Sequence, residues 1–359
     1  MISFSSFFSR QQAPLIGLDV SVSSAKLVEL GMDKAGNIVL ERCAIEPLER
    51  GWIVEGNIEK FEEVGSAIKK LLKKSGTKSR NVAMALPPSA VITKKVLLPS
   101  GISPKDLEQQ VEVEASQYIP FPLEEVNLDF CVVGPSSTVQ GEVEVLIAAS
   151  KKDKVQDIQG LAEAVGLTAV ILDVESYASR LAINRLTDRL PEKGKGKIVA
   201  LFEIGSYSTS MQVIRDDEAL YERDQAFGGI QLTRQIVSQY GFSTEEAETK
   251  KRNGELPKDY ENTVLMPFLS IFVEEIAQAL QYFFTSTTYN KIDHIFMAGG
   301  SAALMGLAEA VSSHTEIACT QVNPFEGMEI SSSVRMARMA REAPSYLTSC
   351  GLALRRFDK

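Results

Sequence analysis

Two stretches of the chain, half its length apart, carry the same pattern: IGLDVSVSSAKLVEL at residues 16–30 and ALFEIGSYSTSMQVI at residues 200–214. Each is an apolar run, a corner of small residues and a second apolar run, which predicts a β-hairpin. Laid over each other without a gap, they place Asp19 on Glu203. The sequence therefore predicts two related halves, each opening with a hairpin that has a carboxylate at the end of its first strand.

Such a hairpin has a specific chemical use. A tight corner of small residues presents backbone N–H groups and hydroxyls that cradle phosphate oxygens, and a neighbouring carboxylate can hold Mg²⁺ through its waters. Two hairpins facing each other across a cleft would clamp a triphosphate from both sides. Two unrelated surface hairpins are the alternative, and the repeat, which also places Ser24 on Ser208, argues against it.

A third element has the same character. The segment MAGGS, residues 297–301, lies between an apolar strand and a helix expected from about residue 301 to 313. Its two glycines allow a flat ligand to approach the backbone, and a helix N-terminus favours a phosphate or ribose oxygen. A simple strand-to-helix turn is the alternative for this segment taken alone.

The composition argues against several classes of protein. The 359 residues carry a formal net charge of −9 and no long basic run, which disfavours a general nucleic-acid-binding protein. Four cysteines without a CxxC pair and two histidines indicate neither a disulfide framework nor a zinc ribbon nor a His-rich metal site, and fit a reducing cytosol. The most apolar stretch, residues 264–284, contains Glu274 and Glu275, so we expect a core helix rather than a membrane span.

Proline and small residues divide the chain. The first part predicts three strands, a helix ended by Gly76, and one or two further strands. A compact αββαβ block is expected over about residues 98–168, with a helix that begins at Pro104. The loop PEKGKGK, residues 191–197, predicts a boundary, after which the second half begins with its own hairpin.

The order of these elements resembles the actin-like ATPase superfamily, which includes actin, sugar kinases, heat-shock chaperones and the cell-division protein FtsA. Short segments spread over nearly the whole chain narrow the resemblance to the PilM family of type IV pilus assembly. These segments are EASQYIPFPLEEV (114–126), DVESYA (173–178), FGGIQLTRQI (227–236), LPKDY (256–260), QYFF (281–284), VNPFEGM (322–328) and CGLALRRFD (350–358).

The resemblance implies an α/β actin-like ATPase fold, with two related halves around a nucleotide cleft and an FtsA-like inserted subdomain. The expected ranges are 1–14 for a flexible N-terminal tail, 15–97 for the first part of subdomain 1A, 98–168 for the inserted subdomain 1C, 169–195 for the connecting helix of 1A, 196–229 and 286–330 for subdomain 2A, 230–285 for subdomain 2B, and 331–359 for a C-terminal helix that returns to 1A.

The same resemblance implies ATP or ADP and Mg²⁺ as cofactors. Asp19 and Glu203 would hold Mg²⁺ through water, Lys26 would reach the β- and γ-phosphates, and Glu175 resembles a carboxylate that positions water or metal. The other implied nucleotide-binding residues are Ser21, Ser23, Ser24, Gly205, Ser206, Ser208, Gly228, Gly229, Glu248, Lys250, Gly299, Gly300 and Ser301. A solvated strand lysine at 26 and an ordinary surface pair at 248 and 250 are the alternatives.

Two departures from the superfamily pattern bear on catalysis. Its corner usually reads D-x-G, whereas the first corner here reads Asp19-Val20-Ser21 and the second has Glu203 in place of aspartate. An added methylene moves a carboxylate by roughly 1.5 Å, and a misplacement of that order can cost about 100-fold in a chemical step. Metal contacts through water adjust more easily, so we expect nucleotide binding with slow or absent hydrolysis.

The resemblance also implies a partner. In the family, a groove between the inserted subdomain and 1A receives the N-terminal cytoplasmic peptide of the membrane protein PilN, and an apolar, small and aromatic helix end suits an extended peptide. The implied groove residues are Val113, Ala115, Ser116, Tyr118, Ile119 and Phe121. A plain core role is the alternative for residues 113, 119 and 121. The chain ends without an FtsA-like amphipathic helix, so its attachment to the inner membrane is expected to be indirect, through this partner.

The expected function is thus an ATP-binding cytoplasmic scaffold that links the pilus assembly motor to the membrane complex, with other pilus proteins, motor ATPases and possible self-association as further contacts. An active small-molecule kinase or ATPase is one alternative, for which Glu175 is the obvious base. A filament-forming cytoskeletal protein is the other. Turnover with a Glu175→Ala control tests the first alternative, and sedimentation with ATP tests the second.

Overall fold

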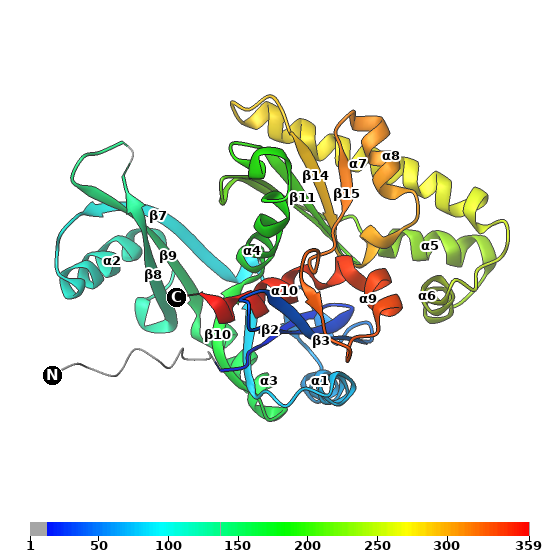
Figure 1. Ribbon diagram of the computed structural model, residues 1–359, viewed down its shortest axis with the longest axis horizontal. Coiled ribbons are helices and arrows are strands. Elements are labelled where there is room, and N and C mark those ends of the chain that lie inside the picture. The colour runs from blue at the N-terminus through cyan, green and yellow to red at the C-terminus, as the bar shows by residue number, and fades with distance from the viewer. Residues whose placement is uncertain (1–12, 137, 359) are drawn as a thin grey trace.

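The computed structural model describes residues 13–136 and 138–358. Two large α/β units lie against each other, and a small domain projects to one side (Figure 1). The expected flexible tail, residues 1–14, falls almost entirely outside the described residues.

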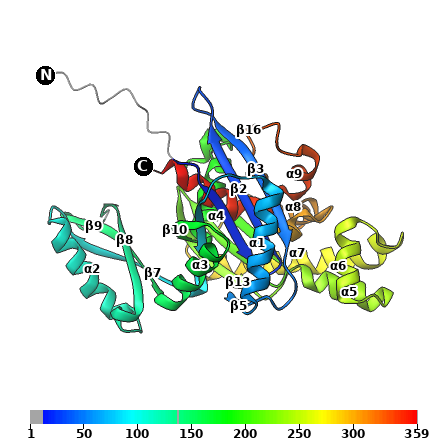
Figure 2. The same cartoon turned by 90° about the horizontal axis from the view of Figure 1, so that it is seen from below.

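The first unit is built on a six-stranded sheet of order β10-β6-β1-β2-β3-β16. Its strands are β1 Ile16–Ser21, β2 Ser24–Met32, β3 Ile38–Pro47, β6 Asn81–Leu86, β10 Thr168–Val174 and β16 Glu329–Ile330. Apolar residues on one face pack against α1 Phe61–Ser75 and α3 Lys152–Ala164. The other face packs against α4 Glu175–Thr187 and α10 Leu347–Leu354. Figure 2 shows α1 and α3 lying over the first of these faces.

The second unit has a five-stranded sheet of order β13-β12-β11-β14-β15. Its strands are β11 Val199–Ile204, β12 Thr209–Arg215, β13 Glu218–Gln225, β14 His294–Ala298 and β15 Cys319–Gln321. One face carries α5 Gly229–Tyr240, α6 Thr244–Asn253, α7 Met266–Ser286 and α8 Leu307–Thr315. The opposite face shares a core with α4 and α10, so these two helices lie between the two sheets.

The two opening hairpins have the same register. In the first hairpin Asp19 pairs with Lys26, and in the second the residue at the matching position, Glu203, pairs with Ser210. A one-residue slip would turn every side chain to the other face of the sheet. The shared register therefore places the two carboxylates at equivalent positions, as the repeat in the sequence predicts.

The small domain consists of a three-stranded sheet, order β7-β9-β8, with α2 Pro104–Tyr118 packed on one face. The strands are β7 Val91–Pro99, β8 Val126–Pro135 and β9 Glu142–Lys151. Ser103 caps α2 by accepting a hydrogen bond from the Asp106 amide, as its position before Pro104 predicts.

The boundaries of this domain differ from the expected range of 98–168. Strand β7 pairs along its whole length with β9, so the domain begins near Val91. Strand β10 pairs with β6 in the first sheet, and α3 packs on that sheet, so the domain ends near Lys151. Periodicity predicts that these segments are strands and helices but carries no information about which sheet they join.

Three further elements differ from expectation. Strand β16 lies within the range 286–330 assigned to the second half, yet it pairs with β3 of the first sheet. Strand β13 was not expected. The helix expected from residue 301 is a short 3₁₀ turn, η5 Gly300–Ala303, and α8 begins at Leu307.

The apolar helix is the core helix that the sequence predicts. Residues Glu261–Ser286, which include a π-helical turn η4 Glu261–Leu265, are long and apolar enough to span a membrane by length and composition. Half of that apolar window is buried in the protein, and Phe268, Phe272 and Phe283 lie in the core of the second unit. This segment therefore serves the fold of the second unit.

The crossing of α4 and α10 depends on Gly351. An added Cβ there would lie 1.8 Å from the Ala178 carbonyl oxygen. Although alanine is the better helix former by about 1 kcal/mol, we expect Gly351→Ala to lower the free energy of unfolding by about 1–3 kcal/mol through overpacking. Chemical denaturation measures this change. Gly134→Ala is the matched control, because no atom lies within 4 Å of its Cβ position, and equal stability of the two variants would contradict the close crossing.

Candidate nucleotide-binding site

The first hairpin holds a buried ion pair. The Lys26 ammonium lies 2.8 Å from the Asp19 carboxylate, and both residues are buried. The same ammonium donates to the Ser21 hydroxyl at 2.8 Å, and that hydroxyl donates to the Ser24 carbonyl at 3.1 Å. Lys26 is therefore no solvated strand lysine. Ser23 lies exposed at the tip of the hairpin.

The second hairpin places Glu203 against the two helices between the sheets. Its Oε1 accepts hydrogen bonds from Ser179 of α4 at 3.0 Å and from Thr348 of α10 at 3.2 Å. Its pKa is raised to about 7: burial is the largest cause and the nearby Asp19 carboxylate adds to it, while the two hydroxyls and the Lys26 ammonium act in the opposite direction. The Asp19 carboxylate therefore lies close enough to disfavour ionisation of Glu203.

Glu175 completes this carboxylate group from the first turn of α4. Burial is the largest cause that raises its pKa, to about 8, followed by the charges of Asp19 and Glu203, and the Lys26 ammonium opposes the shift. Three carboxylates from distant parts of the sequence, and the Lys26 ammonium, thus meet at one place. The repulsion among the carboxylates indicates a site that gains from an added cation.

Asp224 is a fifth member that the sequence reasoning missed. It lies on β13 opposite Ser210, and Ser210 lies opposite Glu203, so the three share one face of the second sheet. Burial raises the pKa of Asp224, and its charge contributes to the raised pKa of Glu175. The alternating charges of YERDQ, residues 221–225, were the available signal.

Glycines bring the loops of the second half into backbone contact. The Gly229 amide donates to the Gly205 carbonyl at 3.0 Å, and the Ile230 amide donates to the Ser206 carbonyl at 2.8 Å. The Ser301 hydroxyl donates to the same Gly205 carbonyl at 3.2 Å. Three expected segments therefore form one cluster.

Side chains larger than hydrogen do not fit in this cluster. A Cβ at Gly228 would lie 2.7 Å from the Gly205 carbonyl oxygen, and a Cβ at Gly299 would lie 2.4 Å from the Ile204 oxygen. Gly299 also has a φ of 90°, in the region that favours glycine. Gly300 follows at the start of η5, and Ser208 accepts the Gly205 amide at 2.9 Å through its carbonyl.

Glu248 and Lys250, the two residues of α6 expected to contact the nucleotide, have separate partners in the structure. Lys250 pairs with Glu246 at 3.7 Å and lies over the Phe242 ring. Lys251 instead lies 2.7 Å from Glu248 and donates to the Thr233 hydroxyl at 2.7 Å. Burial opposes ionisation of Glu248, but Lys251 and Thr233 outweigh it and hold the pKa of that carboxyl below its usual value. The charge pattern does not distinguish position 250 from position 251, because both are lysines. The phase of α6 turns Lys251, and not Lys250, toward Glu248 and Thr233.

The implied Mg²⁺ fits this donor set only through water. Among the described residues, no three His, Cys, Asp or Glu side chains lie close enough to bind one metal ion directly. Asp19, Glu175 and Glu203 nevertheless face one another closely enough to raise the pKa of Glu175 and Glu203. Magnesium keeps several waters and needs only one or two carboxylates, so a hydrated ion matches these residues.

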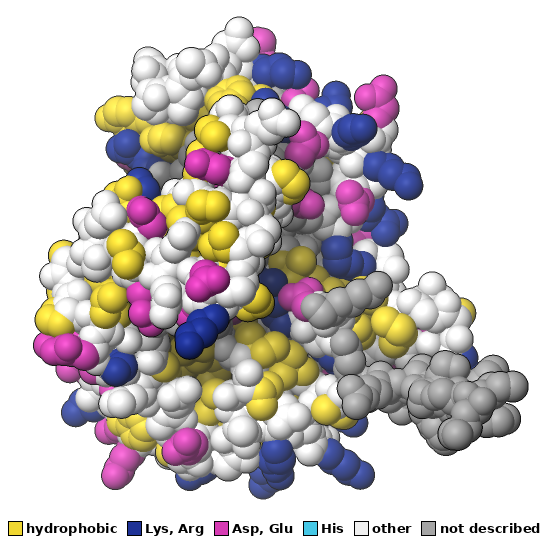
Figure 3. Space-filling view, turned by 90° about the vertical axis from the view of Figure 1, so that its left-hand side faces the viewer, with side chains coloured by type: hydrophobic (Ala, Val, Ile, Leu, Met, Phe, Trp, Pro, Cys, Tyr) yellow, Lys and Arg dark blue, Asp and Glu magenta, His cyan; other side chains and the backbone are white. Residues whose placement is uncertain are grey.

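The six expected groove residues divide into two groups. Ala115 and Ile119 are buried in the core of the small domain, so they cannot line a groove. Val113, Ser116 and Tyr118 are exposed on α2, and the Lys94 ammonium lies 4.8 Å from the Tyr118 ring centroid. Phe121 is half-buried, with the Lys151 ammonium 4.1 Å from its ring centroid. Seen from the side of the small domain, hydrophobic side chains gather around a hollow with lysine or arginine beside it (Figure 3).

Two sheets that open with matching hairpins, two helices between them and a carboxylate group where the hairpins meet define an α/β protein of the actin-like ATPase fold. A family model described as type IV pilus assembly protein PilM matches residues 17–357. The chain therefore belongs to the PilM family of type IV pilus assembly proteins.

Solved structures agree with this assignment. A PilM–PilN type IV pilus biogenesis complex contains a chain that is 28% identical, with a TM-score of 0.77, and the match covers 98% of this chain and 100% of that one. The ethanolamine utilization protein EutJ from Carboxydothermus hydrogenoformans is 15% identical, with a TM-score of 0.57 over 94% of this chain and 88% of that one. A diol dehydratase-reactivating factor is 10% identical, with a TM-score of 0.56 over 96% of this chain and 100% of that one. The latter two share the fold.

The raised pKa of Glu175 makes stability depend on pH. Between pH 4.5 and about 8 the folded protein holds a proton on Glu175 that the unfolded chain releases, so this group stabilises the fold at low pH and loses that effect as pH rises. In the absence of Mg²⁺ and nucleotide, we expect Glu175→Gln to weaken the fall in the unfolding midpoint between pH 5.5 and 8. Glu59→Gln, at an exposed position, should leave the wild-type pH dependence unchanged, and the same slope in all three proteins would contradict the assignment.

Proposed function

We propose that this protein is an ATP-binding scaffold of type IV pilus assembly that binds the N-terminal cytoplasmic peptide of a PilN protein and connects the assembly motor to the membrane complex. The convergence of both hairpins on one carboxylate group carries the proposal. Asp19 and Lys26 come from the first half, Glu203 from the second, and Glu175 from the helix between them. Such an arrangement suits the phosphates and hydrated Mg²⁺ of a nucleotide held between two halves.

Each part of the nucleotide has residues that suit it. Lys26 is a point charge for the β- and γ-phosphates, and Ser21, Ser206 and Ser208 belong to corners of small residues. The glycine cluster admits a flat ribose or base close to the backbone. Lys251 and Glu248 lie beside this cluster, since the Lys251 ammonium approaches the Gly229 carbonyl at 3.5 Å.

Slow or absent hydrolysis remains part of the proposal. The Glu203 Oε1 accepts hydrogen bonds from two hydroxyls, one on α4 and one on α10. These bonds hold the carboxylate against the helices between the sheets, which restricts its movement toward a reacting phosphate. A carboxylate with a pKa of about 8 at Glu175 favours the alternative of an active ATPase, because a proton acceptor is most useful near the operating pH. Bound Mg²⁺ lowers that pKa and removes this advantage.

The proposed peptide site is the exposed side of α2 together with Phe121. Val113 and Tyr118 are 62% and 46% exposed, so two large apolar side chains of α2 are free to contact a partner. Lysines at 94 and 151 lie over the Tyr118 and Phe121 rings. The partner that suits these residues is an extended peptide with apolar anchors. In this proposal the protein lies in the cytoplasm and is attached to the inner membrane indirectly, through the peptide.

We expect Lys251→Gln to weaken MgATP binding by about 10-fold, because a charge-assisted hydrogen bond beside the ligand is lost. Lys250→Gln removes the same charge one residue away and should change affinity by less than about 2-fold, since its ammonium pairs with Glu246. Calorimetry with purified full-length protein measures both. Lys26→Gln should lose about 10-fold or more. If Lys26→Gln and Lys251→Gln both bind MgATP as tightly as the wild type and have native circular dichroism spectra, the proposed nucleotide site is wrong.

For the peptide, we expect Tyr118→Ala to weaken binding of a synthetic PilN N-terminal peptide by about 10-fold, in line with the loss of an aromatic anchor. Val139→Ser changes another exposed apolar residue of the same domain and should bind as the wild type does. Fluorescence anisotropy with and without MgATP gives both affinities. If MgATP changes the affinity for the peptide, the peptide must change the affinity for MgATP by the same factor. Equal peptide binding by the two variants and the wild type would contradict the proposed peptide site.

A further inference from the structure

A cavity of about 290 Å³ lies in the first unit, apart from the carboxylate group of the candidate nucleotide site. Three segments enclose it: the middle of β3, the C-terminal end of α1, and α9 Met336–Glu342 with the residues before it. Its lining residues are Arg42, Cys43, Ala44, Lys74, Ser75, Ser333, Arg335, Arg338, Met339, Glu342 and Tyr346. Four of them are cationic and one is anionic.

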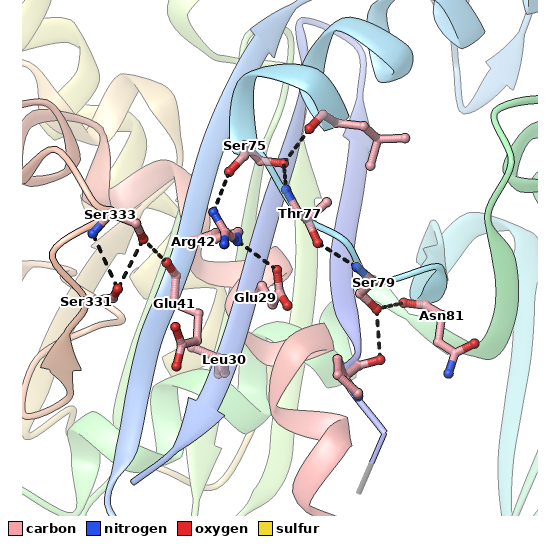
Figure 4. Close-up of polar contacts among 12 residues, drawn as sticks. Glu29, Leu30, Glu41, Arg42, Ser75, Thr77, Ser79, Asn81, Ser331 and Ser333 are labelled. Atoms are coloured by element: carbon pink, nitrogen blue, oxygen red, sulfur yellow. Dashed lines mark hydrogen bonds and ion pairs between the residues drawn. The ribbon is translucent and has the colours of Figure 1, made fainter.

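The cations differ in how far they are neutralised. Arg42 lies 3.5 Å from Glu29 and donates to the Ser75 carbonyl at 3.2 Å. Lys74 lies 3.2 Å from Glu46. Neither glutamate lines the cavity, so the positive groups face it while their counter-charges do not. Figure 4 shows Arg42 between Ser75 and Glu29.

Two more arginines complete the lining: Arg338 of α9, and Arg335, which immediately precedes this helix. The Arg338 Nε–H donates to both carboxylate oxygens of Glu342, at 3.0 and 3.2 Å. Arg335 is exposed, and its guanidinium makes no hydrogen bond or ion pair with any residue that the structure describes; only its backbone carbonyl is engaged, by the Arg338 and Met339 amides. The four cations of the lining and their three glutamate partners, at 29, 46 and 342, therefore carry a formal net charge of +1. The chain as a whole carries −9, so this region has the opposite sign.

The two serines that line the cavity, Ser75 and Ser333, already donate their hydroxyl hydrogens to backbone carbonyls. The Ser75 hydroxyl donates to the Leu72 carbonyl at 2.9 Å, and the Ser333 hydroxyl donates to the Glu41 carbonyl at 2.6 Å (Figure 4). The donors that remain for a ligand are thus the guanidinium groups and the Lys74 ammonium. The planar fork of a guanidinium matches the oxygens of a phosphate group, to which it donates two parallel hydrogen bonds.

We propose that this cavity binds a small phosphate monoester, with Arg335 as its principal ligand and Arg42 and Lys74 as supporting cations. A phosphate monoester carries between one and two negative charges near pH 7, which matches the single unneutralised positive charge. The size of the cavity suits a small molecule rather than a folded partner. The proposal does not rest on the nucleotide site.

The test is calorimetric titration of the full-length protein with glycerol 3-phosphate, at low salt and with the nucleotide site saturated by MgADP. We expect saturable binding that Arg335→Gln weakens by about 10-fold, as the loss of a charged hydrogen-bond pair predicts. Arg335→Lys should recover part of the affinity through its charge. Arg341→Gln is the matched control, because Arg341 is exposed on α9, six residues after Arg335, and does not line the cavity.

Three results overturn the proposal: no saturable binding, equal binding by the 335 and 341 variants, or succinate binding as tightly as glycerol 3-phosphate. The last would make the site one for carboxylates. The titration also separates this site from the nucleotide site. Lys26→Gln should lose ATP affinity and keep glycerol 3-phosphate affinity in an MgADP-free titration, whereas a loss of both would mean that the phosphate had bound in the nucleotide site.

Discussion

The structure depends on the close crossing of α4 and α10 between the two sheets. A Cβ at Gly351 of α10 would overlap the Ala178 carbonyl of α4, and a Cβ at Gly17 of β1 would lie 2.0 Å from the Ser349 carbonyl oxygen of α10. Two glycines thus let α10 approach a strand on one side and a helix on the other. The same two helices supply Ser179 and Thr348, which hold Glu203. Packing in the core therefore fixes the carboxylate of the second hairpin relative to that of the first.

The charges at this junction explain how the fold tolerates several buried carboxylates in one place. Asp19 is neutralised by Lys26 in a buried pair, and separating that pair would leave an uncompensated buried charge. Among the described residues, neither Glu175 nor Glu203 forms an ion pair, and both hold protons more tightly than a free carboxyl does. A bound cation would replace those protons. The acidic character of this carboxylate group is therefore what the proposed metal–nucleotide ligand would neutralise.

Local patterns in the sequence predicted the hairpins, their shared register and the capped helix at Pro104, because these follow from the periodicity and turn chemistry of neighbouring residues. Long-range pairing was not accessible in the same way. Strand β7 joins β9, and β10 joins β6, through backbone hydrogen bonds that leave no trace in side-chain pattern. The choice between Lys250 and Lys251 depended on helix phase, and Ala115 and Ile119 belong to the core because α2 turns them toward its sheet.

The small domain is joined to the rest of the protein by a narrow neck. Val91 pairs with Ser150 at the point where both strands leave the first unit, and the Ser150 hydroxyl donates to the Ala90 carbonyl at 2.8 Å. Farther out, Lys95 pairs with Glu218 of β13 at 2.8 Å, which spans the small domain and the second unit. That pair is solvent-exposed, and exposed pairs contribute only about 0.2–1 kcal/mol. Mechanical coupling between the proposed peptide site and the proposed nucleotide site would therefore pass mainly through the neck, where backbone and buried hydroxyl contacts fix the direction in which β7 and β9 leave the first unit.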